Sequence, residues 1–143
     1  MSKIIYTNSD GTVAIIHPIG DVNDAIKAVP SGLSYEIVDD SVIPTDRLFR
    51  DAWKQNSKII ETDIAKAKEI HKTNIRNART PKLAELDIEF QKALETSAST
   101  TDIVAKKQAL RDAPADSAIN SATSEAELKS QWNTSILGDS PYS

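Results

Sequence analysis

The stretch TDIAKAKEIHKTNIRNARTPKLAELDIEFQKALET, residues 62–96, decides the fold because it carries the longest sustained helical period in the chain. Its apolar or small residues recur at steps of three and four, which places them on one side of an α-helix. These positions are Ile64, Ala67, His71, Ile75, Ala78, Leu83, Leu86, Phe90, Ala93 and Leu94. Thr62 and Asp63 supply a capping oxygen and a negative charge where a helix begins.

Pro81 interrupts this pattern, because proline has no N–H to donate to the residue four positions back. Residues 62–96 therefore form either one rod of roughly 50 Å kinked at Pro81, or two helices that meet there. We expect another chain to stabilise the arm, because the rest of this small chain offers few apolar residues to cover it. The expected seam comprises Leu83, Leu86, Phe90 and Leu94. The alternative is a self-contained fold, in which later helices turn back at residues 97–100 and cover the same seam.

The sequence before this arm predicts a β-rich head, residues 1–61. Residues 3–19 favour a β-hairpin around the turn Asn8-Ser9-Asp10-Gly11, and residues 21–29 favour a short helix. A strand follows at residues 35–38. Residues 48–62 predict a second hairpin, with strands at 48–53 and 58–62, although Thr45 and Asp46 could equally cap a short helix at 48–53.

Beyond the arm, residues 101–112 predict a further helix, and the capping box Ser124-Glu125-Ala126-Glu127 begins another that carries Leu128 and Trp132. Residues 134–143 lack periodicity, and we expect a flexible tail unless a partner holds it. The predicted fold class is thus α+β. A head of two hairpins and a short helix (1–61) precedes a helical region of three to four helices (62–133) and the tail (134–143).

Composition narrows the classes of function. The chain has 143 residues, of which 39% are hydrophobic and only 5% aromatic, so a core is possible but thin. Its net charge of −4 makes nucleic-acid binding unlikely as a general role. No run approaches 18 apolar residues, and the N-terminus does not resemble a signal peptide. We therefore expect that the protein is made in a cytoplasm and does not associate with a membrane. The absence of cysteine excludes disulfides and thiol chemistry.

No motif predicts catalysis. Neither His17 nor His71 has a second ligand nearby on a shared helical face, so both are interpreted as structural. The acidic residues Asp39, Asp40, Asp46 and Asp51 do not follow a calcium-loop pattern and are interpreted as turn and cap residues. Four glycines leave little room for a phosphate-binding loop. We expect no enzyme activity, no cofactor and no metal.

Two clusters suggest contact with a partner. The first half of the arm is basic, and among its cations Glu69 is the single acidic residue. These cations are Lys66, Lys68, Lys72, Arg76, Arg79 and Lys82. This patch is either a docking face for an acidic partner or nucleic acid, or a solvated helix face. In the head, the candidate interface residues Arg47, Phe49, Arg50 and Trp53 combine arginine with aromatic rings, as interface anchors do. The alternative there is a local ion-pair network that includes Asp46 and Asp51. Trp132 is a further interface candidate.

Three segments resemble a known group of proteins: residues 4–12, residues 35–53 and the helix at 64–79. They are similar to small proteins encoded in the tail modules of tailed bacteriophages, called tail assembly chaperones, tail fibre assembly proteins or virion structural proteins. Residues 106–112 and 125–132 also resemble the ends of such proteins. There a closing Leu-Lys-x-x-Trp-Pro is usual, whereas Asn133 stands in place of that proline here and ten residues follow.

This resemblance implies a non-enzymatic protein without a cofactor, whose partners are phage tail or tail-fibre proteins in a homo- or hetero-oligomer. It implies synthesis in the host cytoplasm and a final location in the virion tail. One hypothesis is a structural or adaptor component that docks tail or fibre proteins. The other is a transient tail (fibre) assembly chaperone that is absent from the mature virion.

Overall fold

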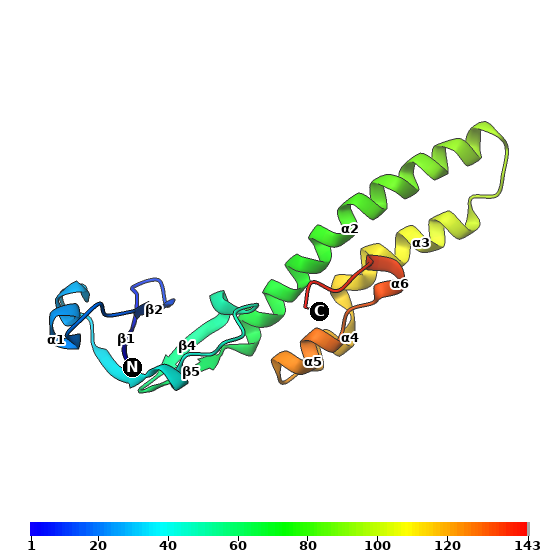
Figure 1. Cartoon of the computed structure of the whole chain (residues 1–143). Helices are drawn as coiled ribbons and strands as arrows, with labels where there is room; N and C mark the ends of the chain where they lie inside the picture. The colour runs from blue at the N-terminus through cyan, green and yellow to red at the C-terminus, as the bar shows by residue number, and fades with distance from the viewer. Residues whose placement is uncertain (143) are drawn as a thin grey trace. The chain divides into compact units, whose positions relative to one another are not determined.

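The computed structural model describes residues 1–142. The chain divides into two compact units, Met1–Ala67 and Lys68–Ser143. Antiparallel strands occupy the first part of the chain and helices the second, which confirms the predicted α+β class (Figure 1). Helix α2, Ile64–Glu95, begins at the end of the first unit and continues through the second. The boundary between the units therefore lies a few residues after the predicted one.

The first unit contains a three-stranded antiparallel sheet of β1 (Ser2–Thr7), β2 (Val13–Ile16) and β3 (Tyr35–Asp39), in the order β2-β1-β3. The predicted first hairpin is present, with Ile5 of β1 opposite Ile15 of β2. Gly11 lies at a φ of 86° in its turn and donates its N–H to the carbonyl of Asn8 at 2.9 Å. Glycine adopts this left-handed conformation without steric cost, so the residue suits the turn.

A short helical segment connects β2 to β3, close to where residues 21–29 predicted it. Helix α1 (Val22–Ala25) leads into the 3₁₀ turn η1 (Ile26–Ala28). The carboxylate of Asp21 accepts a hydrogen bond from the N–H of Asn23 at 2.8 Å, and so satisfies a donor that the helix itself leaves unpaired. A second 3₁₀ turn, η2 (Asp40–Val42), follows β3.

The second hairpin begins later than predicted. Its strands are β4 (Trp53–Asn56) and β5 (Ile59–Thr62), paired antiparallel. The predicted strand at 48–53 is wrong, because this segment contains the 3₁₀ turn η3 (Arg50–Ala52). The alternative of a capped helical turn is closer, since the carboxylate of Asp46 accepts a hydrogen bond from the N–H of Leu48 at 3.0 Å.

Both sheets contribute to the core of the first unit. Its buried cluster consists of Ile5, Val13, Val38, Trp53 and Ile60, and the partly buried residues Ile15, Val42 and Ile43 pack against it. Side chains that alternate along β1, β2 and β3 meet residues from the β4–β5 hairpin in this cluster. The hairpin therefore supplies part of the hydrophobic burial that a three-stranded sheet of this size lacks by itself.

In the second unit α2 runs through Pro81 as one helix, which decides between the two alternatives for residues 62–96. Four shorter helices follow: α3 (Thr101–Asp112), α4 (Ser117–Ser121), α5 (Glu125–Ser130) and α6 (Thr134–Leu137), with the 3₁₀ turn η4 (Ala113–Ala115) after α3. Four of these helices, α2 to α5, lie within residues 62–133, which confirms the prediction of three to four helices there, whereas α6 lies beyond this range.

Residues 134–143, for which we expected a flexible tail, contain helix α6 at their start. The side chain of Asn133 accepts hydrogen bonds from the N–H of Ser135 at 3.1 Å and from its hydroxyl. Asn133 thus caps this last helix. The prediction missed the cap because one turn of helix leaves no periodic signal.

The turn at residues 96–100 directs α3 back along α2 (Figure 1). Ser97 has a φ of 57°, its N–H bonds the carbonyl of Leu94 at 3.3 Å, and the N–H of Ala98 bonds that of Ala93 at 2.8 Å. This is a Schellman motif, which satisfies carbonyls at the end of a helix. Lys107 of α3 then lies 2.5 Å from the carboxylate of Asp87 in α2.

Candidate functional site

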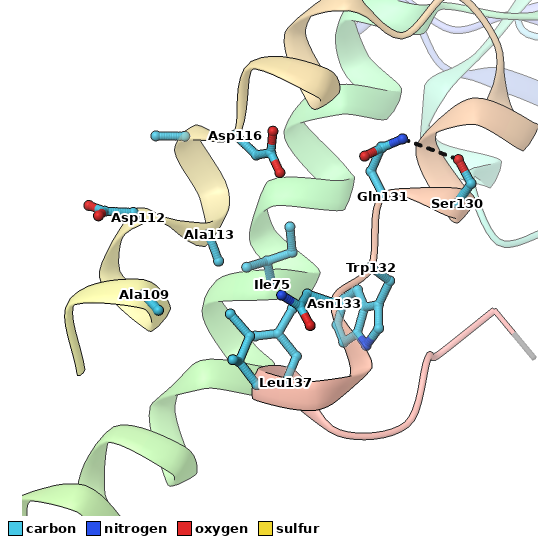
Figure 2. A pocket seen from close by; sticks show the side chains of 12 residues that line it. Ile75, Ala109, Asp112, Ala113, Asp116, Ser130, Gln131, Trp132, Asn133 and Leu137 are labelled. Atoms are coloured by element: carbon cyan, nitrogen blue, oxygen red, sulfur yellow. Dashed lines mark hydrogen bonds between the residues drawn. The ribbon is translucent and has the colours of Figure 1, made fainter. Parts of the chain in front are cut away.

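A groove of about 640 Å³ lies within the second unit (Figure 2). Segments far apart in the sequence build it. Ile75 of α2 forms one side, Ala109 of α3 and Asp112 at its end form another, and Trp132 and Leu137 come from the segment that follows α5. A hollow assembled in this way exists only in the folded unit.

The groove combines apolar walls with a polar rim. Ile75 and Leu137 are buried, while Trp132 is partly buried at its wall. Asp116 accepts a hydrogen bond from the N–H of Ala118 at 2.9 Å, and so caps α4. The other acidic residue, Asp112, accepts one from the amide of Gln108 at 2.9 Å. These contacts give both carboxylates a structural role and leave the groove without a paired acid and base.

Contacts with Gly138, His71 and Tyr142 hold the Trp132 side chain in place. Its indole N–H donates to the carbonyl of Gly138 at 3.0 Å. Edge-to-face contacts join its ring to His71, with centroids 6.2 Å apart, and to Tyr142, with centroids 6.0 Å apart. A tryptophan held in this way presents the part of its ring that lines the groove at little entropic cost.

His71 lies fully buried behind this tryptophan and bonds through both ring nitrogens. Its Nε2 lies 3.0 Å from the carbonyl of Gln131, which can only accept, so Nε2 carries the proton. Nδ1 therefore accepts from the hydroxyl of Tyr142 at 2.5 Å, and Asn74 donates to that hydroxyl at 3.2 Å. The His71 and Tyr142 rings also stack, with centroids 5.5 Å apart. This network attaches residue 142 to α2.

Burial changes the acidity of both rings. It lowers the pKa of His71, an effect that the hydrogen bond to Gln131 only partly opposes, because a buried imidazolium loses its hydration. Burial likewise raises the pKa of Tyr142, against the smaller effect of the bond from Asn74. Both groups are therefore neutral near neutral pH, and the contacts agree with the structural interpretation of His71.

The predicted seam on α2 is covered in part by the chain itself. Leu86 is only 8% exposed, and Leu83 and Phe90 are half-buried. The ammonium group of Lys107 lies 5.3 Å from the centre of the Phe90 ring, so α3 reaches this face. In the middle of the seam, therefore, the structure follows the alternative in which later helices turn back and cover α2. Leu94, by contrast, is 53% exposed, and the expected partner chain stays a prediction.

The predicted cluster in the head is mostly core. Phe49 and Trp53 are each 1% exposed, so neither ring is at the surface as an interface anchor would be. The guanidinium of Arg50 lies 4.8 Å from the Trp53 ring centre and donates to the carbonyl of Val13 at 3.0 Å. Arg47 lies 5.8 Å from the same ring and is exposed. Cation–π packing over a core tryptophan explains why arginines and aromatic rings occur together here.

Sequence reasoning named Trp132 as an interface candidate, which stays a prediction, but it missed the residues that hold this side chain. His71 was assigned to the apolar stripe of α2, and Tyr142 to a flexible tail, although the two rings stack. A separation of 71 residues leaves no local signal for such a contact. The capping residues Asn133 and Asp116 were the nearest available sign that the last part of the chain is ordered.

Within residues 1–142, no group of three or more histidine, aspartate or glutamate side chains is placed to hold a metal ion. Over the same residues, no helix has the length and apolar character needed to cross a membrane. No family model, no curated protein and no solved structure matches this chain.

Proposed function

We propose that this chain is a non-enzymatic structural or adaptor component of a bacteriophage tail, which docks a tail or fibre protein. The resemblance of residues 4–12, 35–53 and 64–79 to small tail-module proteins supports the phage context. The groove of the second unit, with a partly exposed tryptophan on its wall, is the observation that supports docking.

The groove has the composition of a protein-binding surface. Interfaces commonly have an apolar centre with an aromatic anchor, surrounded by a polar rim. Ile75, Leu137 and Trp132 supply the apolar part, and Gln131 and Asn133 lie beside them. The hollow of about 640 Å³ has room for several side chains of a partner segment.

A substitution in the wall tests this role without removing a core contact. Ala109 lines the groove and is exposed, so Ala109→Arg should fill the hollow and leave α3 intact. We expect this variant to bind the tail or fibre protein encoded beside it about tenfold or more weakly. Ala105→Arg is the matched control, because Ala105 is exposed on the same helix and does not line the groove. Equal binding by both variants would exclude the groove as the docking site.

Mass spectrometry of purified virions tests the assignment to the tail. Copies in fixed stoichiometry with the tail proteins are the expected result for a structural or adaptor component. Absence from the mature virion, with binding to a tail protein during assembly, would instead identify a transient assembly chaperone. Absence of any interaction with tail or fibre proteins would exclude both.

A further inference from the structure

A second hollow of the helical unit, about 370 Å³ in volume, is surrounded by positive charge. Lys72, Arg76 and Arg79 approach it from α2, where the spacing of four and three places them on one face. Arg111 approaches it from the last turn of α3. The remaining lining residues are Pro114, Ala115 and Asn120, so none of the lining residues carries a negative charge.

Two of the four cations already have partners. Arg79 donates to the carbonyl of Arg111 at 2.9 Å and to that of Leu110 at 3.3 Å, and so satisfies carbonyls at the end of α3. Lys72 lies 3.7 Å from the carboxylate of Glu69. The Glu69 side chain is 69% exposed and that of Lys72 is 20% exposed, and a single contact of this length to a solvent-exposed carboxylate is weak enough to be exchanged for another anion.

The other two guanidinium groups are available. Arg76 and Arg111 are exposed, and within residues 1–142 neither forms a side-chain hydrogen bond or an ion pair. Two acidic residues near the end of α3, Asp112 and Asp116, form no ion pair with these guanidinium groups within residues 1–142. Asp112 accepts from Gln108 and Asp116 caps α4, and both line the groove of Figure 2 rather than this hollow.

We infer that this hollow binds the carboxylate groups of an acidic segment of a partner protein. Four cations held around one hollow repel one another, and a bound anion relieves that repulsion. The planar guanidinium groups of Arg76 and Arg111 match the two oxygens of a carboxylate. The inference concerns a surface separate from the groove, and it does not depend on a role in a phage tail.

The surroundings favour a protein over a nucleic acid. No aromatic side chain lines the hollow, so bases have nothing to stack on. The whole chain carries a net charge of −4, which repels an extended polyanion more than a short acidic segment that reaches only this site. A hollow of about 370 Å³ accommodates individual side chains rather than a strand.

Fluorescence anisotropy with a labelled hexaglutamate peptide tests the inference on the full chain, at an ionic strength of about 0.15 M. We expect the double variant Arg76→Gln/Arg111→Gln to bind this peptide about tenfold or more weakly than the parent chain. Arg79 is kept, because its loss would leave the end of α3 uncapped. Circular dichroism melts establish that the variant remains folded.

The matched control is Lys92→Gln/Lys106→Gln, which removes the same charge from exposed positions outside the hollow. This control should bind the peptide nearly as well as the parent chain. Equal losses in both double variants would mean that only overall charge matters, and would overturn the site. No binding by the parent chain would overturn it as well. Tighter, arginine-dependent binding of a DNA oligonucleotide of equal charge would overturn the assignment to a protein partner.

Discussion

At the scale of single residues, His71 shows how one buried polar group orders a distant part of the chain. Both of its ring nitrogens are engaged, and the bond to the Gln131 carbonyl fixes the proton on Nε2. Protonation of Nδ1 would place a donor against the hydroxyl of Tyr142, which then loses its acceptor. The network therefore requires the neutral ring.

We expect the stability of the chain to decrease in mild acid because of His71. Burial lowers its pKa in the folded protein below about 6.5, the value for an exposed histidine. Below that pH the unfolded state binds the proton first, so the free energy of unfolding falls until the pH passes the lower folded pKa. Denaturant unfolding between about pH 7.5 and pH 5 measures this dependence.

Variants separate this effect from other titrations. His71→Gln should be less stable at neutral pH and should lose much of the dependence on pH in this window. His17→Gln, at an exposed position, should keep it. If His71→Gln retained the full pH dependence of the parent chain, another group would be responsible.

Trp53 has the corresponding role in the first unit, where it joins the buried cluster between the two sheets. Trp53→Ala should lower the free energy of unfolding by about 3–5 kcal/mol, because it leaves a cavity in a thin core. Tyr35→Ala, at a partly exposed position on β3, should cost clearly less. Chemical denaturation followed by circular dichroism measures both, and similar losses would contradict the burial of Trp53.

The sequence identified these residues better than it assigned their roles. Arg50, Phe49 and Trp53 form a pattern typical of interfaces, yet the same pattern arises when arginines cover a core tryptophan. Composition cannot separate the two, because both need a cation near an aromatic face. Burial decides between the two roles, and the structure confirms the expectation that Phe49 and Trp53 are at least partly buried.

At the scale of secondary structure, the capping residues that begin a helix were informative even where the helix was too short to show a period. The capping box was predicted, and the hydroxyl of Ser124 accepts from the N–H of Glu127 at 3.2 Å. The carboxylate of Glu127, however, accepts from the N–H of Thr123 at 2.6 Å rather than from that of Ser124. Periodicity correctly located α2 and α3, but the one-turn helices α4 and α6 have too few residues to show a period.

The end of α2 carries a residue in an unfavourable conformation. Ser97 has a φ of 57°, and side chains with a Cβ rarely adopt this left-handed region. Ser97→Gly should therefore stabilise the chain by about 0.5–1 kcal/mol, because the strain exceeds the added flexibility of the unfolded chain. Thermal unfolding measures the change. Ala98→Gly is the control and should be neutral or destabilising, since a glycine there relieves no positive φ.

At the scale of the whole molecule, the groove depends on contacts that no local pattern contains. Ile75, Asp112, Trp132 and Leu137 lie in separate elements, and they meet only after α3 has turned back and α5 and α6 have packed. The sequence predicted the α+β order and the position of α2. It could not predict which later helices would cover α2, because Leu110 and Leu128 would suit several packings equally well.

Substitutions on the apolar face of α2 can distinguish residues that the chain itself buries from residues that a partner would bury. Leu86 is 8% exposed and Leu94 is 53% exposed, although both belong to the predicted seam. Leu86→Asp should destabilise the isolated chain by about 3 kcal/mol or more, because it buries an unpaired charge and removes a packed side chain. Leu94→Asp should change its stability by less than about 0.5 kcal/mol, as is usual at the surface.

If a partner covers Leu94, then Leu94→Asp should weaken binding even though it affects stability less than Leu86→Asp does. Leu94→Asp would then leave the melting curve unchanged and weaken association, measured by light scattering for copies of this chain or by co-purification for a tail protein. A destabilisation by Leu94→Asp as large as that by Leu86→Asp, at concentrations where the parent chain self-associates, would mean that copies of the chain cover the end of α2 in the folded state. Equal stability and equal association in the parent and the variant would remove Leu94 from the seam.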